Sequence, residues 1–132
     1  MAFLSFFSIL VSMFLIDAIW LGIMVPKVYA PLLGPLLADS MRLLPGLIFY
    51  FLFAFALNIF VVLPALREES AWTSLWMMGA LFGLVTYGTY DLTNLATLKN
   101  WPAILSVIDL CWGAILTGTV SVISVYITRY FI

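Results

Sequence analysis

Three aspartates, Asp17, Asp91 and Asp109, stand inside long apolar stretches of this sequence. A carboxylate in a low-dielectric environment is costly unless it is paired, hydrated or protonated. Each lies eight or nine residues from the proline, lysine or tryptophan that marks the nearest end of its apolar stretch. In helices this spacing predicts a common depth of roughly 12 Å. Three acids at one depth suggest a shared site that holds a proton, a cation or a cationic headgroup.

Each of two aspartates is followed by a tryptophan at the same spacing, in "LIDAIW" and "VIDLCW". Residues three apart share a helix face, so the indole N–H of Trp20 or Trp112 is suitably placed to donate to a carboxylate. We include both tryptophans, together with Tyr87 and Asn94, among the candidate binding residues. Two alternatives stay open: the spacing arises by chance, or each aspartate caps or bonds a neighbouring helix, which suits Asp91 best.

Small and polar residues form two rows at four-residue spacing on either side of residue 100. The rows are Gly79, Gly83, Tyr87 and Asp91, and then Asp109, Gly113, Thr117 and Ser121. Residues four apart share a helix face, so a hairpin about residue 100 would place Gly83 opposite Thr117 and Tyr87 opposite Gly113. Gly79 and Gly83 also form GxxxG, a close-packing pattern of membrane helices. We therefore predict that Gly79, Gly83, Gly113 and Thr117 are helix-packing residues.

The composition indicates where these helices lie. Of 132 residues, 66% are hydrophobic and 8% are charged, whereas soluble domains are about a quarter charged. About 20 apolar residues cross a bilayer as a helix, and four segments qualify: residues 2–25, 45–66, 73–95 and 102–127. We predict an all-α polytopic membrane protein, one transmembrane domain over residues 1–132, with four transmembrane helices in a bundle.

The connection formed by residues 26–44 is long and still apolar, and it contains Pro31, Gly34 and Pro35. We expect the first helix to stop at Pro26, because proline lacks an amide donor and clashes with the preceding turn. The rest of the connection is predicted to be an interfacial segment between the first two spans. Basic residues divide three against two between the two membrane faces, which slightly favours both termini outside.

Several classes of function are excluded or disfavoured. The chain has no histidine, which rules out histidine-ligated haem, the usual zinc sites and serine–histidine chemistry. Cys111 is the only cysteine, so no internal disulfide forms. The net charge is −1 and the basic residues are scattered, so no nucleic-acid partner is indicated. We predict no cofactor and no metal, and the sequence identifies no catalytic residue.

The stretch "YDLTNLATLKNWP", with the upstream "DAIWLG" and the downstream "VIDLCWG", resembles a bacterial family of small four-span inner-membrane proteins. That family is catalogued as a domain of unknown function, number 2177. The resemblance covers nearly the whole chain, and residues 90–102 are its most specific part. It implies a polytopic protein of the bacterial inner membrane and transfers no activity. Members also occur beside lipid-modifying genes, which favours a lipid ligand.

These observations support three functions of different classes. The leading prediction is a non-enzymatic membrane protein whose acidic intramembrane pocket binds or passes a proton, a cation or a lipid headgroup. The second is an accessory subunit or assembly factor of a larger membrane complex. The third is a small lipid-modifying enzyme that uses the carboxylates as acid and base groups or as ligands for magnesium or calcium. Expected partners are membrane lipids and, for a transporter, further copies of the chain in a homo-oligomer.

Overall fold

The computed structural model describes residues 1–132 and contains helices joined by short turns. The first segment runs through α1 (Ala2–Met24), a π-helical turn (Val25–Tyr29), α2 (Ala30–Leu33) and a 3-10 turn (Gly34–Leu36). The second runs through α3 (Leu43–Leu57), a second π-helical turn (Asn58–Val62) and α4 (Leu63–Glu68). The last two helices are α5 (Trp72–Thr97) and α6 (Ala103–Phe131). The fold is therefore all-α.

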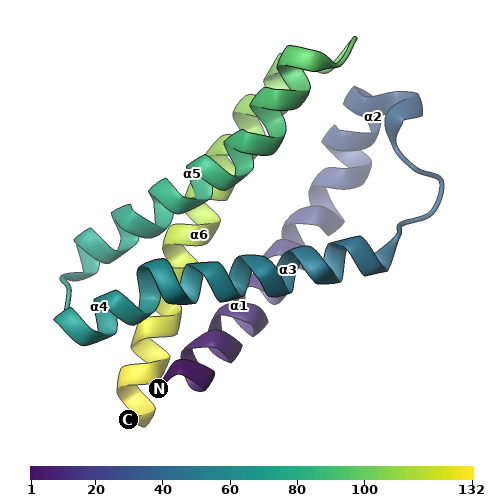
Figure 1. The fold of residues 1–132 in the computed structure, drawn as a ribbon. Coiled ribbons are helices and arrows are strands. Elements are labelled where there is room, and N and C mark those ends of the chain that lie inside the picture. The colour runs from purple at the N-terminus through teal and green to yellow at the C-terminus, as the bar shows by residue number, and fades with distance from the viewer.

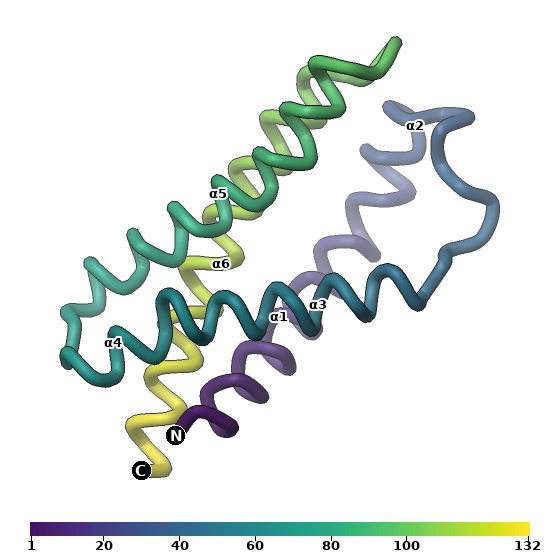
Figure 2. Tube along the Cα trace, in the orientation of Figure 1, coloured from purple at the N-terminus to yellow at the C-terminus, as the bar shows by residue number.

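The helices form an up-and-down arrangement. Helices α5 and α6 make an antiparallel hairpin, α1 packs against α6, and α3 packs against α1. Figure 1 shows the two termini together at one end of the molecule, with α2 and the α5–α6 turn at the other. The trace in Figure 2 shows that the α3–α4 segment crosses in front of α1 and α6. Its two ends join helices at opposite ends of the molecule.

Three of the four segments are long and apolar enough to cross a membrane: Ala2–Leu36, Leu43–Glu68 and Ala103–Phe131. Large apolar side chains are exposed along them, including Phe3 at 81% and Phe60 at 68%. Such a surface requires hydrocarbon rather than water around it. Helix α5 is not among the three, because its tyrosines, threonines, Asp91 and Asn94 lower its hydropathy.

The expected end of the first helix at Pro26 is wrong. The helix continues beyond this residue, because the chain widens there into the π-helical turn Val25–Tyr29. A π turn bonds each amide to a carbonyl five residues back, which relieves the clash that proline causes in a regular helix. The chain leaves the helix at Gly34, which has a positive φ of 54°. The non-helical connection is thus much shorter than residues 26–44.

The second π-helical turn carries a polar contact between segments. The Ser5 hydroxyl donates to the Asn58 side-chain oxygen at 2.7 Å, and the Asn58 amide donates to the Ala2 carbonyl at 3.1 Å. The Ser124 hydroxyl donates to the Ser5 carbonyl at 2.9 Å. These bonds join α1, the second segment and α6 near the termini. Asn58 is therefore an interhelical hydrogen-bonding residue.

Candidate functional site

Glycines bring α5 and α6 into close contact and set their register. A methyl group added at Gly83 would overlap the Gly113 carbonyl and the Thr117 hydroxyl, and one added at Gly79 would meet Ser121. At Gly113 the space is filled by the ring of Tyr87. The two four-residue rows therefore lie against each other. This register carries Asp91 and Asp109 to the same part of the hairpin.

Asp17 is buried in α1 and accepts two hydrogen bonds from neutral donors. The Trp112 indole donates to one carboxylate oxygen at 3.0 Å. The Tyr50 hydroxyl donates to the other oxygen. These two bonds join α1 to α6 and to α3. Both oxygens of Asp17 are thus partnered without a positive charge.

Asp109 is half-buried in α6, and two consecutive hydrogen bonds connect it to Tyr29 and then to Trp20. The Tyr29 hydroxyl donates to its carboxylate at 2.5 Å, and the Trp20 indole donates to the Tyr29 oxygen at 2.9 Å. Trp20 also stacks on Trp112, with ring centroids 4.1 Å apart and planes 5° from parallel. Each tryptophan therefore donates to a residue on another segment or turn, and not to the aspartate three residues before it.

A cavity of about 390 Å³ opens beside these groups. Its lining comprises Asp17, Trp20, Leu21, Tyr29, Phe49, Thr86, Tyr87, Tyr90, Asp109 and Trp112. Five of the seven predicted binding residues line this space, and Asp91 and Asn94 do not. The lining contains two carboxylates, six aromatic rings and no basic side chain.

Asp91 does not line the cavity and is fully buried, with 0% exposure. Neither of its carboxylate oxygens has a hydrogen-bond donor, and the neighbouring carboxyl group is that of Asp109. Its main chain is fixed, because the Ser106 hydroxyl donates to the Asp91 carbonyl at 3.2 Å and Trp101 donates to Ser106 at 3.0 Å. A proton held between the two carboxyls would give Asp91 the partner it lacks.

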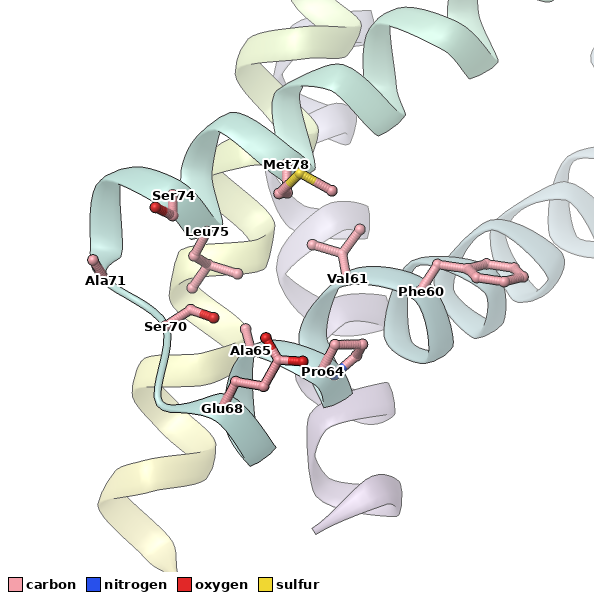
Figure 3. A pocket seen from close by; sticks show the side chains of 10 residues that line it. All are labelled: Phe60, Val61, Pro64, Ala65, Glu68, Ser70, Ala71, Ser74, Leu75 and Met78. Carbon is pink, nitrogen blue, oxygen red and sulfur yellow. The ribbon is translucent and has the colours of Figure 1, made fainter.

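The remaining predicted residue and a second cavity are less suited to a site. Asn94 lies one turn beyond Tyr90 on α5 and does not line the acidic cavity. The second cavity, of about 420 Å³, lies between the second π turn, α4 and the start of α5. In Figure 3 its polar groups are Glu68, Ser70 and Ser74, and Glu68 is exposed. It encloses no buried charge, so the acidic cavity is the candidate site.

Sequence reasoning missed two members of the site, Tyr29 and Tyr50. Tyr29 was assigned to an interfacial connection, because the first helix was expected to end at Pro26. Tyr50 is one of two polar side chains in an otherwise apolar segment, and a buried hydroxyl there needs a partner. That requirement is the signal that leads to Asp17. No comparable signal pointed to Tyr29.

Comparison with known proteins gives one match. A family model described as Predicted membrane protein (DUF2177) matches residues 2–126. No curated protein and no solved structure matches the chain.

Proposed function

The chain belongs to this family of predicted membrane proteins, DUF2177, and we propose that it binds a positively charged group in the acidic cavity beside α1 and α6. We further propose that it crosses the bacterial inner membrane four times, with α5 as the fourth span. The 26 residues of α5 suffice to cross the hydrocarbon, and its small residues pack it along α6.

One observation carries the proposal. Asp17 and Asp109 line one cavity, their hydrogen-bond donors are all neutral, and no basic residue lines it. Negative charges inside a membrane bundle are costly and are usually paired or protonated. A proton, a metal cation or a cationic headgroup in the cavity would compensate them. An accessory-subunit role and an enzymatic role have no comparable observation in their favour.

The binding proposal is tested by comparing matched variants of the purified protein in a non-ionic detergent. Binding of sodium, potassium, magnesium, calcium and tetramethylammonium is measured by calorimetry, and carboxyl protonation by infrared spectroscopy. We expect Asp109→Asn to weaken binding of one of these cations at least about tenfold, or to change carboxyl protonation. Asp39→Asn, an identical change in an exposed loop, should alter neither. Equal behaviour of the two variants would refute the proposal.

The four-span proposal makes a separate prediction about the termini. An even number of crossings places both ends of the chain on one side of the membrane, as their position in Figure 1 suggests. Reporters fused at residue 1 and at residue 132 should give the same location in cells. Opposite locations would show that α5 does not cross.

A further inference from the structure

We infer that the positively charged group is an alkylated ammonium, carried either by a free amine or by a lipid headgroup. This inference rests on the proposed function and narrows it to one ligand class. It comes from the walls of the cavity, from the arrangement of its oxygens and from its openings.

The walls are mainly aromatic. The stacked indoles of Trp20 and Trp112 lie beside Tyr29, Tyr87 and Phe49. Aromatic faces attract cations, and cages of such rings are a recurrent way of binding alkylated ammonium groups. The volume of about 390 Å³ falls in the range of small-molecule sites and far exceeds the space of a bare ion.

The oxygens are poorly arranged for a metal ion. Magnesium and calcium require six or more oxygen ligands at short distances. No group of three or more His, Cys, Asp or Glu side chains in the chain is close enough to hold a metal. Both oxygens of Asp17 already accept hydrogen bonds, as does one oxygen of Asp109. An alkylated ammonium needs only a nearby negative charge and apolar contacts, which two carboxylates and six aromatic side chains supply.

The cavity also opens toward the surface of the helices. Phe49 and Tyr90 line it and are 44% and 59% exposed. Phe49 lies on α3, whose surface is covered with exposed Leu, Ile and Phe side chains. A ligand with an apolar tail can therefore place its headgroup beside Asp109 while the tail stays among lipids. Asp91, fully buried and without a donor, adds a third negative or proton-sharing group next to Asp109.

The experiment titrates purified protein in maltoside detergent with tetramethylammonium chloride, replacing sodium chloride at constant concentration. The readout is the NMR signals of the Trp20 and Trp112 indoles, which donate to Tyr29 and Asp17. We expect saturable shifts of both signals, while Trp72, far from the cavity at the start of α5, stays unchanged. Asp109→Asn should weaken the apparent affinity at least about tenfold. Phe49→Leu, a mild change at an exposed ring, should weaken it about two- to fivefold.

Reconstitution in nanodiscs separates the two sources of ammonium. If a lipid headgroup is the ligand, phosphatidylcholine should produce the shifted signals without added amine, and phosphatidylglycerol should not. If a free amine is the ligand, tetramethylammonium should shift the signals in both lipids. Absence of any saturable shift, or shifts unaffected by Asp109→Asn and Phe49→Leu, would overturn the inference. Asp109-dependent binding of sodium or calcium, without tetramethylammonium binding, would overturn it and leave the proposed function intact.

Discussion

Gly83→Leu is expected to separate α5 from α6 and to destabilise the protein by about 3 kcal/mol or more. The added side chain would overlap the Gly113 carbonyl and the Thr117 hydroxyl. A main-chain carbonyl on a packed helix cannot rotate away, so the helices must move apart. That movement would also shift Asp91 relative to Asp109. The free energy of unfolding is measured by titration with sodium dodecyl sulfate, followed by circular dichroism.

Gly22→Leu provides the matched control for this change. Gly22 also lies inside a helix, and nothing lies within 4 Å of a methyl group built on it. Both substitutions raise helix propensity by the same amount. The difference between their losses of unfolding free energy therefore measures the effect of the α5–α6 contact at Gly83. Leu81→Phe, at an exposed position of α5, should likewise be mild. Similar losses for Gly83→Leu and Gly22→Leu would contradict the close packing of the hairpin.

Asp91→Asn is expected to stabilise the unliganded protein by about 1–3 kcal/mol, although it changes a fully buried side chain. The buried pair must either hold two adjacent charges or take up a shared proton, and both states cost free energy, because neither oxygen of Asp91 has a donor and the neighbouring group is the Asp109 carboxyl. The asparagine amide removes the charge and donates to Asp109. The free energy of unfolding is measured as above, and infrared spectroscopy follows the protonated carboxyl band.

Asp17→Asn makes the same chemical change and should have the opposite effect. Both oxygens of Asp17 accept hydrogen bonds, from Tyr50 and Trp112, whereas an amide offers only one acceptor. The Tyr50 hydroxyl would have to turn and accept instead, and two bonds to a charged group would become weaker neutral ones. We expect this variant to be destabilised. We also expect the infrared band of a shared proton to persist in it and to disappear in Asp91→Asn. If Asp91→Asn destabilises the protein and leaves the band unchanged, the two carboxyls do not share a proton.

The sequence predicts the hairpin well, because the face that a residue occupies follows from its spacing along its own helix. Rows at four-residue spacing pair Gly83 with Thr117 and Tyr87 with Gly113, and the same pairs are adjacent in the structure. The common depth of the aspartates stays a prediction, and for Asp17 it was counted from Pro26, where the helix does not end. Both arguments use only the regular geometry of a helix. The membrane character follows from composition alone and agrees with the family match.

The sequence does not predict which side chain donates a hydrogen bond to which aspartate. The sequence predicts that the Trp112 indole can donate to a carboxylate, and this is confirmed, but the carboxylate is that of Asp17 on α1, which the spacing does not identify. Partners across helices depend on how α1 rotates against α6, and periodicity does not determine that rotation. Tyr50 reaches Asp17 for the same reason, through the crossing of α3 over α1. The site is therefore a tertiary property, even though its acids can be located by counting.

The π-helical turn Val25–Tyr29 decides which side chain faces Asp109. In a regular α-helix, a residue nine positions after Trp20 would lie about 180° around the axis from it. The wide π turn contains one residue more than an α-helical turn. That extra residue rotates Tyr29 and the positions after it by about 100° around the helix axis, back toward the side of Trp20. This rotation brings the Tyr29 hydroxyl to Trp20 and Asp109. Insertion or deletion of a single residue in this turn would therefore rotate Tyr29 and α2 and change the partner of Asp109, while α1 and the carboxylates kept their places, a change that evolution can make in one step.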